Sequence, residues 1–181
     1  MAHSVTHVLV PIILLEIFRD YIIKDKKKFP LHYVLIGGIA GLLPDLDIIV
    51  FWFLYSSGFA LEAVHRTFSH TLFVPLFFLL LGLLAIKVKS RKIGKHHMKL
   101  STIFFVVAFG TFIHLVLDVL VVGYIMPLYP FSHFSMGWNL IYILPFSKEI
   151  ADITIPPAID AALLVLWLIH EEWKHKISDF I

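Results

Sequence analysis

The sequence lacks cysteine and has few charged residues. The absence of cysteine among 181 residues excludes disulfides and thiolate metal sites, so His, Asp and Glu are the remaining candidate metal ligands. Only 15% of the residues are charged, whereas 59% are hydrophobic and the mean hydropathy is +0.88. This balance excludes an ordinary soluble domain and predicts a membrane protein.

Five apolar segments approach the roughly 20 residues that a helix needs to cross the hydrocarbon core of a bilayer. No linker or internal repeat divides the chain, so we expect one domain over 1–181 with an all-α fold, a polytopic membrane helix bundle of about five spans. The first segment is the weakest, because Glu16 and Arg19 lie within it, and whether it fully crosses is open. It is expected to be a retained helix and not a cleaved signal peptide. The expected spans are 5–23, 33–55, 68–86, 100–126 and 153–169.

Basic residues are nearly absent from two of the loops that connect these spans. The loops 56–67 and 127–152 hold only Arg66 and Lys148, whereas twelve of the fifteen Lys and Arg residues lie in three other stretches. The positive-inside rule then predicts a cytoplasmic C-terminus, with the N-terminus on the extracytoplasmic side. We prefer this explanation to binding of anionic lipid or nucleic acid, and expect no nucleic-acid partner. The three basic stretches are 24–28, 87–99 and 170–180.

Seven ionisable residues fall in the outer parts of the predicted spans. Ionisable groups inside a bilayer cost about 2.5–3.5 kcal/mol each, so they usually pair with one another or mark a site. A buried divalent cation would neutralise the carboxylates and use the imidazoles as ligands, which predicts a buried His/Asp metal site on the extracytoplasmic side. Zinc suits this set best, and the number of ions is open. The candidate ligands are His7, Asp45, Asp47, His65, His70, His114 and Asp118.

Two of the motifs predict local geometry. In "HLVLD", His114 and Asp118 stand four residues apart and share a helix face, although a simple hydrogen bond between packed helices would show the same spacing. In "LPDLD", Pro44 cannot donate to the helix ladder, which predicts a break and a second half-helix whose first turn holds Asp45 and Asp47. The alternative is that these two carboxylates are only helix caps.

The motif "HRTFSH" places two imidazoles, a guanidinium and a hydroxyl within residues 65–70. Arg66 has a planar fork that suits phosphate or carboxylate, although passive contact with lipid headgroups is an alternative. Ser69 is either a helix N-cap or a contact near the site. Because five residues on one helix would separate the two imidazoles, we expect a loop-to-helix junction here.

In order and spacing, "MAHSVTH", "LLPDLD", "HRTFSH", "HLVLD" and "PLYPFS" resemble the inner-membrane metal-dependent hydrolase family that includes the LexA-regulated YdjM-type proteins. The resemblance covers roughly residues 1–135. It implies that the same seven residues form the metal site and that Arg66 and Ser69 either surround the metal ligands or contact substrate. The family pattern also looks distantly like zinc-dependent phospholipase C and P1-type nucleases.

The sequence departs from the family pattern in three places. Ile48 stands where many relatives have His, which bears on the number of metal ions. Ser69 replaces Thr and keeps the hydroxyl. A hydroxyl usual after the HxxxD element is missing around Val121 and Val122.

These observations favour a hydrolase that uses metal-activated water on a phosphoester of a lipid or lipid-linked substrate. Asp45 or Asp47 is the expected general base, and Arg66 is expected to hold a phosphoryl oxygen. The aromatic loop 127–146 is expected to lie at the membrane interface. No obligate protein partner is evident. The alternatives are a metal-ion or proton-coupled transporter, and a membrane protein with a structural metal.

Overall fold

The computed structural model describes residues 4–25, 27–58, 65–87, 98–121 and 123–175, and most of them are helical. These residues contain no β-strand, only an isolated bridge between Ile125 and Met136. The all-α prediction is therefore confirmed. The elements are α1 (Ser4–Ile17), a π-helical stretch (Phe18–Ile23), α2 (Leu31–Ala40), a 3-10 turn (Pro44–Leu46), α3 (Asp47–Tyr55), α5 (Phe73–Lys87), α6 (Leu100–Leu120), a second 3-10 turn (Leu140–Ile143), α7 (Lys148–Ile153) and α8 (Ile155–His175).

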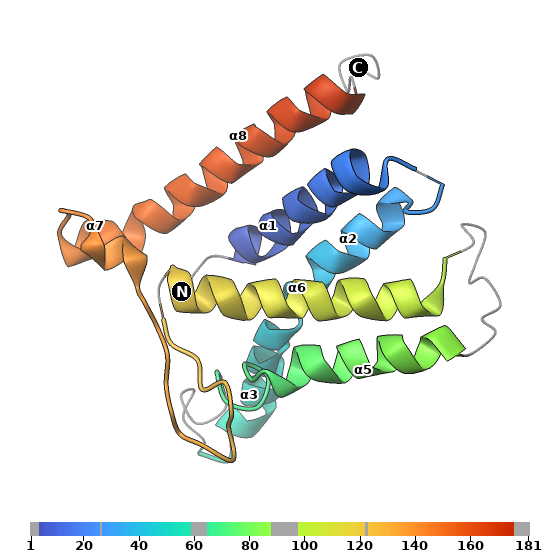
Figure 1. Ribbon diagram of the computed structural model, residues 1–181. Helices are drawn as coiled ribbons and strands as arrows, with labels where there is room; N and C mark the ends of the chain where they lie inside the picture. The colour runs from blue at the N-terminus through green and yellow to red at the C-terminus, as the bar shows by residue number, and fades with distance from the viewer. Residues whose placement is uncertain (1–3, 26, 59–64, 88–97, 122, 176–181) are drawn as a thin grey trace.

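Helix α6 lies at the centre of the bundle and packs against both α2 and α5, while α1 packs against α2. Figure 1 shows that the N-terminal end of α1, the N-terminal end of α5 and the C-terminal end of α6 lie at one end of the molecule. The α1–α2 connection and the C-terminal end of α8 lie at the opposite end. The motifs with candidate ligands thus meet at one end of the bundle.

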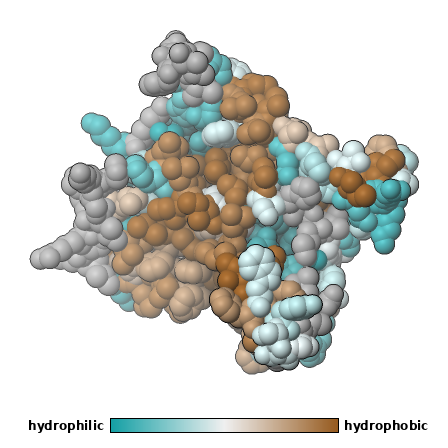
Figure 2. All heavy atoms as spheres, turned by 180° about the vertical axis from the view of Figure 1, so that it is seen from behind, coloured by the Kyte–Doolittle hydropathy of each residue, from teal (hydrophilic) through white to brown (hydrophobic). Residues whose placement is uncertain are grey.

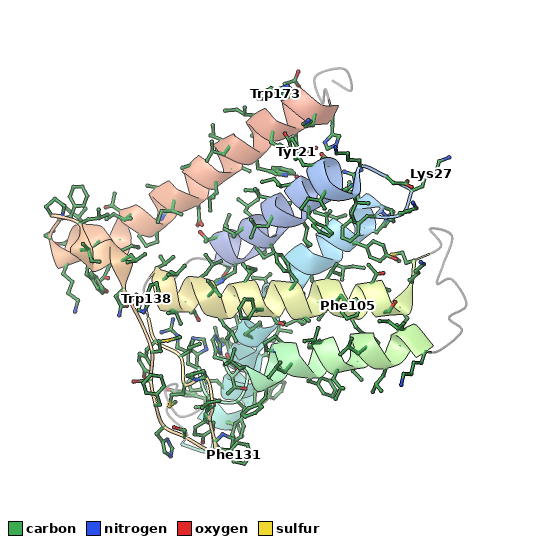
Figure 3. The ribbon with its side chains drawn as sticks, viewed as in Figure 1. Tyr21, Lys27, Phe105, Phe131, Trp138 and Trp173 are labelled. Atoms are coloured by element: carbon green, nitrogen blue, oxygen red, sulfur yellow. The ribbon has the colours of Figure 1, made fainter. Side chains whose placement is uncertain are left out.

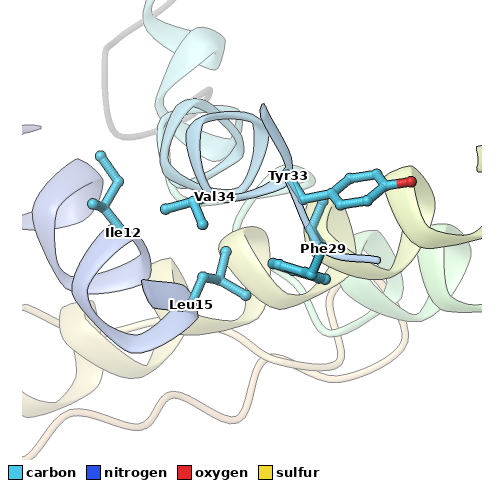
Figure 4. Close-up of a cluster of buried hydrophobic side chains, with 6 residues drawn as sticks. Ile12, Leu15, Phe29, Tyr33 and Val34 are labelled. Atoms are coloured by element: carbon cyan, nitrogen blue, oxygen red, sulfur yellow. The ribbon is translucent and has the colours of Figure 1, made fainter. Parts of the chain in front are cut away.

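A small apolar core holds α1, α2 and α6 together. Ile12, Leu15 and Val34 pack with Phe29 and Tyr33 in the cluster shown in Figure 4, which Val106 of α6 completes. Much of the remaining apolar surface faces outward, and Figure 2 shows broad hydrophobic areas over the helices. A small core with an apolar exterior is the arrangement expected of a protein whose surroundings are lipid.

By length and composition, two helices can cross a membrane: α6 and the continuous stretch Lys148–His175. A third crossing is Leu31–Ala40 together with Pro44–Tyr55, a pair bent by 47°. Helix α5 is apolar but has 15 residues, and α1 has 14 before its π-helical continuation. In the described part of the chain, two or three helices are therefore long and apolar enough to span a membrane, and the expected count of five stays a prediction.

The helix ends differ from the expected spans in places that matter for the site. The segment expected at 68–86 begins its helix only at Phe73, because residues 65–72 form consecutive turns. The segment expected at 100–126 ends its helix at Leu120, and Gly123 then has a φ of 139°. Both helices therefore end beside the site, where they were expected to continue.

Candidate metal centre

Four separate parts of the fold bring the candidate ligands together. His7 comes from α1, Asp45 and Asp47 from the break after α2, residues 65–70 from the turns before α5, and His114 and Asp118 from α6. Pro44 begins the 3-10 turn at the break, as the sequence predicted, and α3 then starts at Asp47. Neither the 3-10 turn nor α3 has a side-chain cap at its N-terminus. Asp45 and Asp47 therefore do not act as helix caps, and their oxygens can contact the other candidate ligands.

Two imidazoles and two carboxylates face a common point at the centre of this cluster. His70 and His114 are fully buried, and their Nε2 atoms lie 3.1 Å apart. His70 Nε2 lies 3.4 Å from Asp45 Oδ1 and 3.4 Å from Asp118 Oδ2. His114 Nε2 lies 3.6 Å and 3.5 Å from the same two oxygens. Tetrahedral zinc, with bonds of about 2.0–2.1 Å, holds neighbouring ligand atoms about 3.3 Å apart, so these separations fit one cation.

The outer nitrogens of both imidazoles are held by oxygen atoms. His114 Nδ1 lies 2.7 Å from the carbonyl oxygen of Gly41, which only accepts hydrogen bonds. His70 Nδ1 lies 2.9 Å from Ser69 Oγ and 3.3 Å from Asp47 Oδ2. A proton on each Nδ1 leaves the lone pairs of the two Nε2 atoms pointing at each other, which is unfavourable without a cation between them. This donor set fits a divalent metal ion.

Asp47 accepts hydrogen bonds from several groups at once. Its Oδ2 accepts from Ser69 Oγ at 2.5 Å and from the backbone N–H of Arg66 at 3.2 Å, and its Oδ1 lies 2.8 Å from His65 Nδ1. The Nε2 atom of His65 is then buried without a hydrogen-bond partner. Metal-binding histidines commonly have this arrangement, in which a carboxylate fixes one nitrogen and leaves the other for the metal.

His7 and Arg66 complete the wall around Asp118. The His7 ring stacks on the His114 ring with centroids 3.9 Å apart, and its Nε2 lies 3.5 Å from Asp118 Oδ1. Arg66 Nη2 donates to the same oxygen at 3.4 Å. The Arg66 backbone has a φ of 64°, a left-handed conformation that turns its side chain toward the site.

The donor atoms form overlapping groups that share residues. Within each group the atoms lie no more than 4.8 Å apart, and Asp45, His70 and His114 each belong to two groups. Shared donors are compatible with one ion or with two adjacent ions, so the number stays open. The groups are His7/Asp45/His114, Asp45/His65/His70 and His70/His114/Asp118.

All nine predicted site residues therefore lie in this cluster, although their contacts differ. Sequence reasoning missed two glycines that shape it. Gly41 supplies the carbonyl that holds His114, and the Arg66 guanidinium occupies the space that a side chain at Gly123 would need. Gly41 precedes the Pro44 break, and this was the only signal of its role. Of the positions where a family hydroxyl is missing, Val122 lies outside the described residues.

The sequence comparisons agree with the resemblance seen in the motifs. The family described as YdjM inner membrane protein matches residues 1–176, which extends well beyond the motif region. No significant match was found among curated proteins or among solved structures. The likeness to zinc-dependent phospholipase C and P1-type nucleases stays a prediction. On the family match, the chain belongs to the YdjM inner membrane protein family.

Proposed function

We propose that the protein is a membrane-embedded, metal-dependent hydrolase that cleaves a phosphoester of a lipid or lipid-linked substrate. The observation that carries this proposal is the pair of opposed Nε2 atoms of His70 and His114, flanked by two carboxylates. The cation or cations, which we expect to be zinc, would be held by donors drawn from His7, Asp45, His65, His70, His114 and Asp118. Lewis acidity from the bound cation would favour deprotonation of water near neutral pH.

The residues around the cluster suggest a division of roles. Asp45 is the most exposed ligand candidate, with a side chain 23% accessible, so water reaches the site beside it. If Asp45 is not itself bound to the cation, we favour it over Asp47 as the group that accepts a proton from water. Asp47, whose oxygens are engaged by Ser69 and His65, would orient the imidazoles instead.

We expect Arg66 to bind the phosphoryl group. Its guanidinium lies at the edge of the cluster, next to Asp118, and its side chain is 11% exposed. The Nε atom of Arg66 is buried without a hydrogen-bond partner. A guanidinium with a free donor offers a second contact to a phosphate oxygen and opposes charge that develops there.

An apolar groove beside the site supports a lipid substrate. The groove has a volume of about 440 Å³, runs between α5 and α6, and begins at Leu72, two residues after His70. It includes Leu79 and Phe105 farther along the two helices. An acyl or polyprenyl chain lying in this groove would bring its phosphate toward His70 and Arg66.

Transport is less consistent with the packing. Ile12 and Leu15 lie on α1 between His7 and Glu16, and they pack with Val34 and Val106 in the buried apolar cluster. This cluster separates the His/Asp site from the polar residues at the other end of the bundle. A structural metal would require a closed ligand set, whereas Asp45 is accessible to water.

The test combines metal analysis with hydrolysis of defined lipid phosphates in vesicles. We expect chelation to stop turnover and zinc to restore it. Replacing Asp45, His70 or His114 by Ala should lower turnover by about 100-fold or more, the scale on which single catalytic groups act. The matched control is His133→Ala, which removes an exposed imidazole in the loop after α6.

Unchanged turnover in all three variants would overturn the catalytic assignment. Movement of labelled metal across proteoliposomes without ester cleavage would favour a transporter. If the purified protein retains stoichiometric metal but hydrolyses no lipid phosphate, a structural metal site would be favoured.

A further inference from the structure

A second cluster of potential metal ligands lies at the other end of α1. Glu16 of α1 and His170 and Glu171 of α8 each offer a donor atom, and these atoms lie within 4.8 Å of one another. His170 Nδ1 is 3.9 Å from Glu16 Oε2 and 3.9 Å from Glu171 Oε1. A cation with bonds of about 2.0–2.2 Å spans donor atoms about 3–4 Å apart, so the spacing suits one ion.

Of the two carboxylates in this cluster, Glu16 is buried and Glu171 is partly buried, and among the described residues neither is paired with a basic side chain other than histidine. The Glu16 and Glu171 side chains are 2% and 14% exposed. Within the described part of the chain, no Lys or Arg forms an ion pair with either of them; Glu16 accepts a hydrogen bond from Trp167 Nε1 at 2.9 Å and faces Glu171. Buried carboxylates that face each other need a cation or a proton between them.

Neighbouring atoms extend the cluster and point to a ligand independently. Asp20 has a side chain 5% exposed, and neither of its oxygens makes a hydrogen bond, although its Oδ1 forms an ion pair with Arg19 Nη1 at 3.5 Å. It faces His175 Nε2 at 3.3 Å, while His175 Nδ1 lies 3.0 Å from both oxygens of Glu171. His170 Nε2 is also buried without a hydrogen-bond partner. This order of carboxylate, imidazole and carboxylate is the pattern that supports a metal ligand from behind.

The position of the cluster suggests what a bound cation would do. Helix α8 runs along the outside of the bundle and has one buried residue, Pro156. Polar contacts join it to α1 and to the π-helical stretch that follows, from Thr6 with Asp160 near one end to Asp20 with His175 at the other. Because lipid removes the hydrophobic driving force between helices, close packing and polar contacts hold helices together there, and a shared cation would add to them.

We propose that Glu16, His170 and Glu171 form a second divalent-cation site that joins α8 to α1, separate from the His/Asp site. The ligands are imidazole and carboxylate without thiolate, which suits zinc or a similar transition-metal ion. The two sites share no residue. Loss of one is therefore expected to leave the other intact, and this inference does not depend on the proposed hydrolase activity.

The first measurement is the zinc content per chain after chelation and reloading of the purified protein. Glu16→Gln and His170→Ala should each lower the content by one ion relative to wild type, whereas Glu149→Gln and His133→Ala, at exposed positions, should not. Combination of His170→Ala with His114→Ala should remove ions additively. Zinc content equal to wild type in both cluster variants would overturn the second site.

The second measurement needs no change to the cluster, so it does not depend on the stability of the variants. The chain has no cysteine, so Ile17→Cys and Trp173→Cys place spin labels on exposed positions of α1 and α8. We expect zinc to narrow the distribution of distances between the two spin labels, and chelation to broaden it again. Glu16→Gln in the same background should abolish this response. A distribution that zinc leaves unchanged would overturn the joining of the two helices.

Discussion

At the scale of single residues, the candidate site depends on which atom of each imidazole is free. Sequence spacing identified the residue types, because His and Asp in apolar segments are rarely there by chance. It did not distinguish Asp45, which faces His70 Nε2, from Asp47, which faces His65 Nδ1. That difference arises from the turns at 65–70, whose conformation no spacing rule predicts.

Ser69 provides a test of how the imidazoles are held in orientation. Its hydroxyl donates to Asp47 and contacts His70 Nδ1, so Ser69→Ala should release both groups and weaken zinc binding by about 10–100-fold. Ser69→Thr keeps the hydroxyl and should retain most of the affinity. The measurement is the zinc affinity of each variant, obtained by competition with a chelator. Ser135→Ala, at an exposed position, is the control. Equal affinities for Ser69→Ala and wild type would show that the hydroxyl has no orienting role.

At the scale of helices, close packing brings α1 and α6 against the end of α2. A Cβ at Gly41 would collide with the backbone oxygen of His7, and one at Gly110 of α6 would collide with the backbone oxygen of Gly37. The sequence predicted the Pro44 break correctly, since proline acts through its own backbone. The sequence did not predict the close backbone contacts at Gly41 and Gly110, because these contacts depend on which helices become neighbours.

Gly41→Ala tests whether this packing positions the ligands. The added methyl group should push α2 away from α1, move the carbonyl that holds His114, and lower stability by about 1–3 kcal/mol. The thermal midpoint and the zinc content of the purified variant should both fall. Gly58→Asn is the control, since no atom of the described residues lies within 4 Å of a Cβ built there and Asn tolerates its φ of 82°. A variant with normal midpoint and zinc content would show that α2 can shift without disturbing His114.

At the scale of the whole molecule, the two ends of the bundle have different characters. The end that holds the His/Asp site carries a loop of exposed aromatic residues, including Phe131 and Trp138. The opposite end carries Lys27, near the turn between α1 and α2. Composition predicted this asymmetry, since charge and aromatic residues can be counted along the chain. The number of spans was harder to predict, because α1 and α5 are too short to be assigned by length alone.

The orientation of these ends in the membrane is the remaining prediction from the charge distribution. If the positive-inside rule applies, the aromatic loop and the site face the extracytoplasmic side, and the α1–α2 turn faces the cytoplasm. The absence of cysteine allows single substitutions, Ser135→Cys in the loop and Lys27→Cys in the turn, both at exposed positions. A membrane-impermeant thiol reagent should label intact cells only through Ser135→Cys, and permeabilised cells through both. Labelling of Lys27→Cys alone in intact cells would reverse the orientation and place the site on the cytoplasmic side, where substrate would have to come from the inner leaflet.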